Sequence, residues 1–132
     1  MKTNRTRRFV GELTKGMDVG RALTRLMEEN AIRCGHVRLM GHLERAELLC
    51  DGPKGPSTVT RLLDRHVQII SCEGIITELS GKFEPILYTL VTFEGVAGSV
   101  TVGGILQSAS VVSCHLLLDS FDDLFIRRAI DP

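Results

Sequence analysis

Residues 18–27, Asp-Val-Gly-Arg-Ala-Leu-Thr-Arg-Leu-Met, contain the clearest periodic signal of the chain. Apolar side chains recur there at intervals of three and four residues, which places them along one side of an α-helix. Asp18 precedes this stripe and is a suitable N-cap, because its carboxylate can accept hydrogen bonds from the first turn. The stretch predicts one amphipathic helix over about 18–32 that packs against a core. The apolar stripe consists of Val19, Ala22, Leu23, Leu26 and Met27.

Short apolar runs typical of β-strands surround this helix, one before it and the rest after it. Gly41-His42 separates two of the runs and predicts a tight connection, and Ser80-Gly81-Lys82 has the composition of a hairpin turn. Gly74 follows Glu73 between two runs, which indicates a bulge or a close approach of another backbone. One helix among many strands predicts an α+β domain with a largely antiparallel, twisted sheet. The predicted strands cover 9–13, 32–39, 43–49, 67–72, 75–79, 86–93, 96–106 and 110–118.

The length and composition are those of a single domain. The chain has 132 residues, of which 43% are hydrophobic, and this is enough to form one core. The segment 51–57, rich in Gly and Pro, predicts a surface loop and is too short to link two domains. We expect a flexible basic arm over 1–8, a domain over 9–119 and a C-terminal tail over 120–132. No stretch has the pattern of a signal peptide or a membrane span, which favours a cytoplasmic location without membrane contact.

The charges balance overall but are unevenly distributed. The chain has 16 Lys and Arg residues and 16 Asp and Glu residues, so no net positive field attracts nucleic acid. Asp119, Asp122 and Asp123 place an acidic patch near the C-terminal end, whereas the arm is basic. The arm is the best candidate for contacts to DNA phosphates, although short basic ends are more often solvated. Its basic residues are Lys2, Arg5, Arg7 and Arg8.

Four segments carry a recognisable pattern when they are taken in order. They are 16–19 (Gly-Met-Asp-Val), 41–48 (Gly-His-Leu-Glu-Arg-Ala-Glu-Leu), 73–76 (Glu-Gly-Ile-Ile) and 102–106 (Val-Gly-Gly-Ile-Leu). Their order and spacing resemble the plant and prokaryote conserved (PPC) domain, whose segments include Gly-Ser-Leu-x-x-Ala-x-Leu and Ser-Gly-Thr-Ile. The resemblance runs from about Arg8 to Leu118 and implies a single PPC-type domain. Such domains stand alone in bacteria and archaea and are fused to AT-hook DNA-binding segments in plants.

The histidines that bind metal in many members of this family are absent from this chain. The family's Pro-His-Leu-His-x-His strand corresponds to residues 85–90, Pro-Ile-Leu-Tyr-Thr-Leu, and its Gly-Gly-His-Leu corresponds to residues 103–106, Gly-Gly-Ile-Leu. Isoleucine and leucine offer no ligand to a divalent ion. We therefore identify a divergent prokaryotic member with no metal or other cofactor. Its altered site, a dry apolar patch or a pocket of different chemistry, consists of Ile86, Tyr88 and Leu90, which share a strand face by alternation, together with Ile105.

The remaining polar groups give no catalytic or metal-binding signature. His36 and Cys34 would share a strand face, but two ligands are too few for a structural zinc site. Glu73 and Glu84 flank strands, yet no nucleophile, base and orienting group can be assembled from the sequence. The four cysteines are widely spaced and include no CxxC pair. We interpret them as buried apolar residues of a reduced protein. Candidate turn or pocket residues are Gly41, His42, Glu73, Gly103 and Gly104.

These observations favour a protein that is not an enzyme. The resemblance implies DNA association or transcription regulation, because many members are described as DNA-binding proteins, and it implies a homotrimer. Sheet edges and the apolar altered site also favour self-association. We therefore expect a DNA-associated or regulatory trimeric module. The alternatives are a scaffold for an unidentified protein partner, or a small-ligand-binding domain, in either case without DNA binding.

Overall fold

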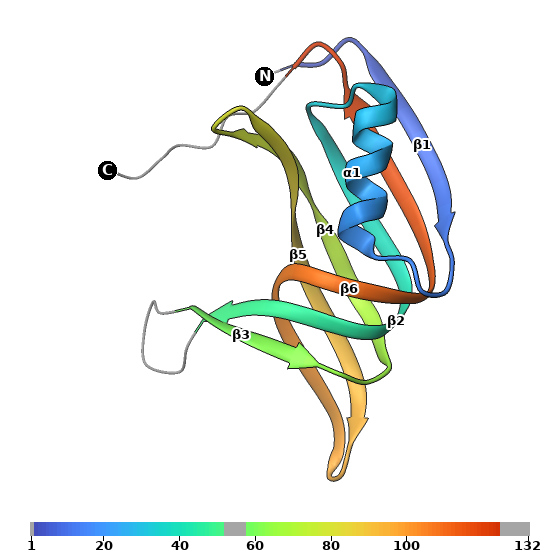
Figure 1. Cartoon of the computed structure of the whole chain (residues 1–132), viewed down its shortest axis with the longest axis vertical. Coiled ribbons are helices and arrows are strands. Elements are labelled where there is room, and N and C mark those ends of the chain that lie inside the picture. Colours follow the sequence, from blue (N-terminus) through green and yellow to red (C-terminus); the bar gives the residue numbers. More distant parts are fainter. Residues whose placement is uncertain (1, 52–57, 125–132) are drawn as a thin grey trace.

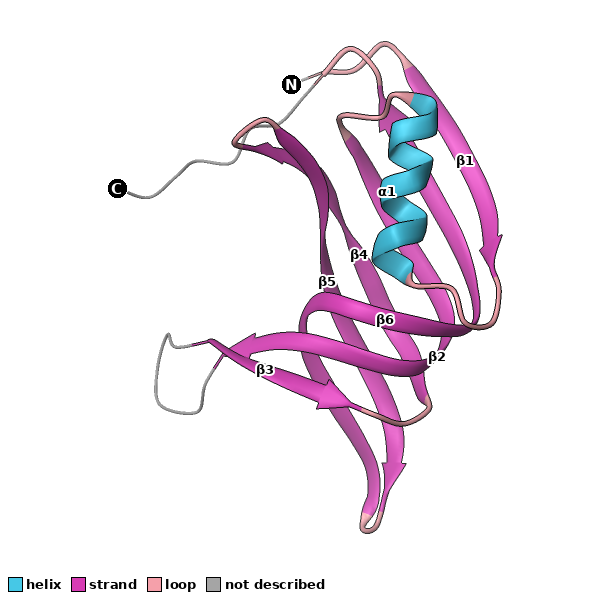
Figure 2. Cartoon of the chain, in the orientation of Figure 1, coloured by secondary structure: helices cyan, strands magenta, loops and turns pink. Residues whose placement is uncertain are grey.

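The computed structural model describes residues 2–51 and 58–124, which form one helix and six strands (Figure 1, Figure 2). Residues 52–57, most of the expected loop, and 125–132, most of the expected tail, lie outside the described residues. The sheet dominates the fold, and the predicted combination of one helix with an antiparallel sheet is confirmed. In chain order the elements are β1 (Thr6–Leu13), α1 (Val19–Asn30), β2 (Gly35–Asp51), β3 (Thr58–Leu63), β4 (Val67–Leu79), β5 (Lys82–Gly95) and β6 (Gly98–Phe121).

The strands form one antiparallel sheet that closes on itself. Their order is β1-β6-β5-β4-β2-β3, and β2 also pairs with β6. The strands β2, β4, β5 and β6 therefore form a closed ring, which leaves β1 and β3 as edge strands. Closure bends the sheet strongly, and Figure 1 shows that β2 and β6 each change direction about midway along their length.

β2 is a single bent strand where the sequence predicted two strands with a tight connection. That prediction is wrong, because Gly41 and His42 lie inside β2 and pair with both β4 and β6. The register shifts between Arg38 and Gly41 and again between His42 and Leu43, which marks β-bulges. Gly41 has φ +133°, and a Cβ there would lie 2.2 Å from the carbonyl oxygen of Ser113. Glycine permits the bend that interrupts the sequence pattern.

The same merging of predicted strands occurs in β4 and β6. β4 passes through Gly74 without a break, and a Cβ at this residue would lie 1.6 Å from the carbonyl oxygen of Ile86. The predicted close backbone approach is therefore confirmed. β6 spans 24 residues where the sequence predicted two strands. The predicted hairpin turn at Ser80 and Gly81 is confirmed, and their φ angles of 52° and 79° are those of a two-residue type I′ connection.

α1 packs against β6 and contributes its apolar stripe to the core. The Asp18 carboxylate accepts a hydrogen bond from the Arg21 backbone N–H at 3.0 Å, as an N-cap does. The helix ends at Asn30, two residues before the predicted end, because Ala31 takes the left-handed conformation. No helix among the described residues has the length and apolarity that crossing a bilayer requires. Val19, Leu23 and Met27 of α1 are buried and join residues of β1, β2, β4, β5 and β6 in one core.

The sheet extends further at both ends of the chain than the sequence predicted. β1 begins at Thr6, so Arg7 and Arg8 belong to a strand and not to an arm. β6 continues to Phe121, two residues into the expected tail. Because β1 and β6 pair along the whole of β1, the two boundaries shift together.

Candidate functional site

The altered family site lies on β5, on the side of the strand that faces away from the core. Tyr88 is 62% exposed and Leu90 is 39% exposed, whereas Ile86 is half-buried. Tyr88 pairs with Ile105 of β6, which brings the fourth residue of the site alongside. The expectation that these strand residues share one face therefore matches their placement. The residues between and after them, Leu87, Thr89 and Val91, are buried.

Apolar side chains on neighbouring strands extend this surface across the sheet. Ile86 pairs with Ile75 of β4, which is 40% exposed. At the edge of the sheet Val10 of β1, which is 73% exposed, pairs with Leu117 of β6. Leu117 pairs in turn with Arg38, Arg38 with Glu73, and Glu73 with Tyr88. Residues paired across strands share a face, so these groups belong to one surface. We call it the open face and define its apolar part as Val10, Met40, Ile75, Tyr88, Leu90 and Leu117.

A series of charges of alternating sign crosses the open face between these apolar groups. Arg8 donates a hydrogen bond from Nε to Asp119 Oδ1 at 2.7 Å, and this contact holds the pKa of the Asp119 carboxyl below its usual range. His36 pairs with Asp119 across β2 and β6, and its Nε2 lies 3.6 Å from Glu73 Oε2. Arg38 Nε lies 3.3 Å from the same Glu73 oxygen. Each arginine in this series thus lies beside a carboxylate, and His36 lies between the two carboxylates of Asp119 and Glu73.

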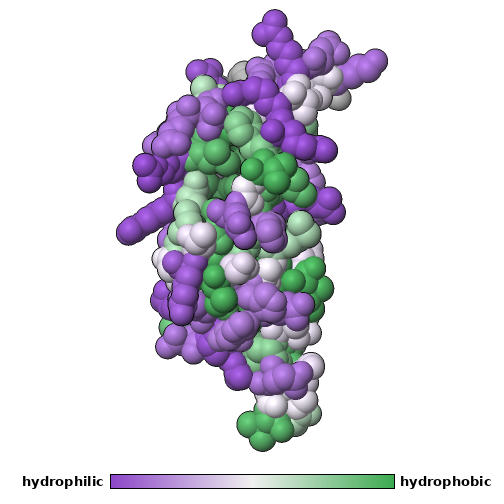
Figure 3. Space-filling view, turned by 90° about the vertical axis from the view of Figure 1, so that its right-hand side faces the viewer, coloured by the Kyte–Doolittle hydropathy of each residue, from purple (hydrophilic) through white to green (hydrophobic). Residues whose placement is uncertain are grey.

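The space-filling view shows apolar residues at the surface. In Figure 3, which views the molecule from the side of β1, green apolar residues lie between purple hydrophilic ones. A further apolar group lies at the lower tip, where β5 and β6 meet in a hairpin. Apolar area on this protein is therefore not confined to the core.

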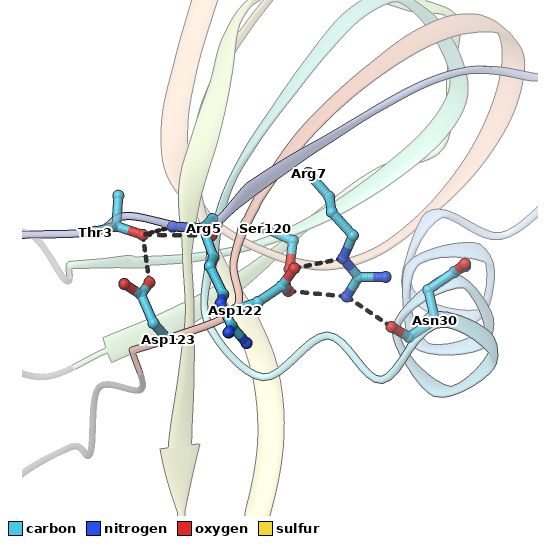
Figure 4. Close-up of polar contacts among 7 residues, drawn as sticks. All are labelled: Thr3, Arg5, Arg7, Asn30, Ser120, Asp122 and Asp123. Atoms are coloured by element: carbon cyan, nitrogen blue, oxygen red, sulfur yellow. Dashed lines mark hydrogen bonds and ion pairs between the residues drawn. The ribbon is translucent and has the colours of Figure 1, made fainter.

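Arg7 ties the N-terminal strand to the C-terminal end of β6 and to α1 (Figure 4). Its Nε and Nη2 lie 2.5 and 2.8 Å from the two Asp122 carboxylate oxygens, and Nη2 also donates to the Asn30 carbonyl oxygen at 2.9 Å. Hydrogen bonds from Arg7 and Ser120 lower the pKa of the Asp122 carboxyl. This bidentate arrangement fixes the guanidinium group in one position.

The basic residues expected to contact phosphates therefore divide into two pairs. Arg7 and Arg8 of β1 form surface ion pairs with Asp122 and Asp119. Lys2 and Arg5 are exposed and precede β1. The predicted basic arm and acidic patch are thus partners within one molecule, a relation that depends on the pairing of β1 with β6.

Gly41 and His42 lie at a bulge of β2 rather than in a turn. His42 Nδ1 lies 2.9 Å from Nε2 of His66, which directly precedes β4, and the two rings meet at 68°. No local sequence pattern indicates this pair, because the two histidines are 24 positions apart. Only the register of β2 with β4 brings them together.

Gly103 and Gly104 allow strands to approach each other closely. A Cβ at Gly104 would lie 2.7 Å from the carbonyl oxygen of Leu49, and one at Gly103 would lie 3.2 Å from Cδ1 of Leu90. The Cys50 thiol donates to the Gly103 carbonyl oxygen at 3.1 Å. The glycine pair therefore serves the packing of β6 against β2 and β5.

A groove of about 670 Å³ between α1 and the strands β5 and β6 was not predicted. It forms only when the helix packs on the sheet, so no local pattern signals it. Ile86 and Ile105 of the altered site contribute to its wall. Its charged lining residues include Arg21, Arg25, Glu28 and Glu84.

The described residues contain no cluster of three or more His, Cys, Asp or Glu side chains placed to hold one ion. Glu84 pairs with Thr77, four residues along β4 from Glu73, so at about 3.3 Å per residue these carboxylates stand well apart. All four cysteines are free, and burial raises the pKa of the Cys72 thiol to about 11. A thiol with so high a pKa is a poor nucleophile at neutral pH.

Several solved structures share this fold at low sequence identity. A metal-containing protein from Archaeoglobus fulgidus is 22% identical, with a TM-score of 0.83 over 98% of this chain and 89% of that one. A protein from Bacteroides thetaiotaomicron, provisionally described as DNA-binding, is 17% identical, with a TM-score of 0.79 over 95% and 85%. Acetolactate decarboxylase from Bacillus subtilis is 11% identical, with a TM-score of 0.61 over 94% and 56%.

These likenesses establish the fold alone. A search of curated proteins found no match. Residues 1–122 match the model of the Plants and Prokaryotes Conserved (PCC) domain, which covers the described sheet and helix almost completely. The chain therefore belongs to the plant and prokaryote conserved domain family.

Proposed function

We propose that this chain is a non-catalytic assembly module that forms a homotrimer through its open face. The observation that carries this proposal is the exposure of large apolar side chains on a regular sheet, above all Tyr88 and Val10. Exposed apolar side chains that lie together, as Tyr88 and Leu90 do on one face of β5, commonly mark interaction sites in soluble proteins. Leu90, in place of a family histidine, adds apolar area to the same surface.

The charges of the open face favour a second copy of the same chain as the occupant. Arg8 and Arg38 alternate there with Asp119 and Glu73, so the face carries both signs in near balance. A surface of this kind can meet another copy of itself without like charges being forced together. A cyclic arrangement would use such contacts repeatedly and would close without open ends.

Sedimentation velocity of the full chain tests this proposal directly. We expect a trimer at micromolar concentration, and we expect the double variant Tyr88→Glu, Leu90→Glu to sediment as a monomer, because it buries two carboxylates at the contact. Val96→Glu is a matched control, because Val96 is exposed at the tip of the β5–β6 hairpin. A wild-type monomer at all concentrations, or equal dissociation of the control, contradicts the proposal.

DNA association within a regulatory role is the second candidate function. It is supported by the fold shared with a protein provisionally described as DNA-binding and by the exposed residues Lys2 and Arg5. It is the weaker candidate because Arg7 and Arg8 are occupied by Asp122 and Asp119. Three copies in a trimer would multiply weak phosphate contacts.

The four free cysteines accord with a reducing, cytoplasmic compartment.

Fluorescence anisotropy with labelled duplex DNA, both AT-rich and mixed, separates the two candidates. Binding that weakens steeply with salt and is reduced in Lys2→Gln, Arg5→Gln supports phosphate contacts by these residues. Arg21→Gln, on the surface of α1, is the control. If the chain is a trimer in sedimentation and does not bind DNA even at low salt, DNA association is ruled out and assembly is the function that stands.

A further inference from the structure

Two histidines from different parts of the chain meet on the surface. His42 belongs to β2 and His66 to the connection between β3 and β4. The ring nitrogens His42 Nδ1 and His66 Nε2 are 2.9 Å apart, and the ring centroids are 5.0 Å apart in an edge-on arrangement. His66 is exposed and His42 is half-buried, so solvent reaches the pair.

The backbone directly after each histidine is held by the core. Leu43 follows His42 and Val67 follows His66, and these two residues pair with each other and are fully buried. The bulge at Gly41 sits directly before His42, and bulges commonly re-aim a side chain near a binding site. Each histidine is therefore followed directly by backbone that the core anchors.

The separation of the two nitrogens suits a shared metal ion. Imidazole nitrogens bind zinc at about 2.0–2.1 Å, so two of them on one ion at cis or tetrahedral angles lie about 2.8–3.4 Å apart. The observed distance of 2.9 Å lies within this range. A rotation of one ring would turn a hydrogen bond between the nitrogens into two bonds to one ion.

We propose that His42 and His66 form a two-histidine binding site for a divalent transition-metal ion. Imidazole suits zinc, nickel and copper, whereas magnesium and calcium prefer oxygen ligands. Water completes the coordination, because the described residues supply no third His, Cys, Asp or Glu to the cluster. The site uses residues other than those of the altered family site on β5.

Isothermal titration of the full chain with NiCl₂ and with ZnCl₂ tests the proposal. The protein is prepared without a polyhistidine tag, treated with a chelator and kept in a buffer that does not coordinate metals. We expect one ion per chain for each metal, with affinity about tenfold or more weaker in His42→Gln and in His66→Gln. Nickel should also raise the thermal unfolding midpoint of the wild type, because it binds only where both histidines are held together.

The other two histidines supply matched controls. His115→Gln removes an exposed histidine of β6, and His36→Gln removes the histidine beside Glu73. Both should bind nickel as the wild type does. Stoichiometric binding that survives in folded His42→Gln and His66→Gln, or no stoichiometric binding by the wild type, overturns the proposal.

A measurement on the wild type tests the site without any variant, so it does not depend on whether the variants fold. In histidine-selective NMR spectra, substoichiometric nickel should broaden the ring signals of two histidines before those of the others. Assignment of the broadened signals to His42 and His66 supports the site. Broadening that begins at His36 or His115 contradicts it.

Discussion

At the scale of single residues, Gly74 shows how tightly β4 and β5 are joined. A Cβ at this position would lie 1.6 Å from the Ile86 carbonyl oxygen, and backbone atoms cannot move aside as a flexible side chain can. We expect Gly74→Ala to lower the free energy of unfolding by about 3 kcal/mol, because overpacking forces the strands apart. Urea denaturation measures this change.

Gly11→Ala is the matched control for that substitution. Gly11 also lies in a strand, but a Cβ there would meet no atom within 4 Å. Its effect should stay within about 0.5 kcal/mol. Equal stability of the two variants would mean that β4 and β5 are not as close at Gly74 as described.

Residue-scale features could be predicted from the sequence where they depend on neighbours along the chain. The common face of Ile86, Tyr88 and Leu90 follows from strand alternation alone, and the glycine inside β4 signalled a close approach. The contact between His42 and His66 depends on the register of two strands, which no local pattern records. The same holds for the ion pair of Arg7 with Asp122.

At the scale of elements, the start of α1 depends on one side chain. The Asp18 carboxylate accepts the Arg21 N–H, which otherwise has no partner within the first turn. Asp18→Ala should lower the free energy of unfolding by about 1 kcal/mol, whereas Asp18→Asn should retain most of the stability, because asparagine also caps helices. Chemical denaturation of both variants checks this, and an equal loss in both would argue against a capping role.

The helix was easier to predict than the strands because its signals are local. Its N-cap and apolar stripe lie within the ten consecutive residues 18–27, and the helix begins where they indicate. β2 and β6 were each predicted as two strands, because their bulges interrupt the alternation of apolar and polar residues. The pairing of β2 with β6, which keeps each strand continuous, is visible only in the folded sheet.

At the scale of the whole molecule, the two ends of the chain are joined. β1 pairs with the last part of β6, and Asp123 accepts hydrogen bonds from the Thr3 hydroxyl and the Asn4 backbone N–H. Together with Arg7 and Asp122, these contacts make the N-terminal residues part of the domain. The sequence showed complementary charges at the two ends but not that they meet.

Removal of residues 1–8 tests whether the N-terminal end is paired with β6. A flexible arm and a paired strand predict opposite results for this truncation. The truncation deletes the pairs that Thr6, Arg7 and Arg8 make with β6. Backbone hydrogen bonds contribute about 0.5–1.5 kcal/mol each, so we expect a loss of about 2–3 kcal/mol in the free energy of unfolding. A chain that lacks only residues 1–2 retains these pairs and should unfold like the full chain in the same urea titration. If the two truncated chains were equally stable, the first half of β1 would contribute nothing to the sheet, and the domain would begin at Phe9 after all.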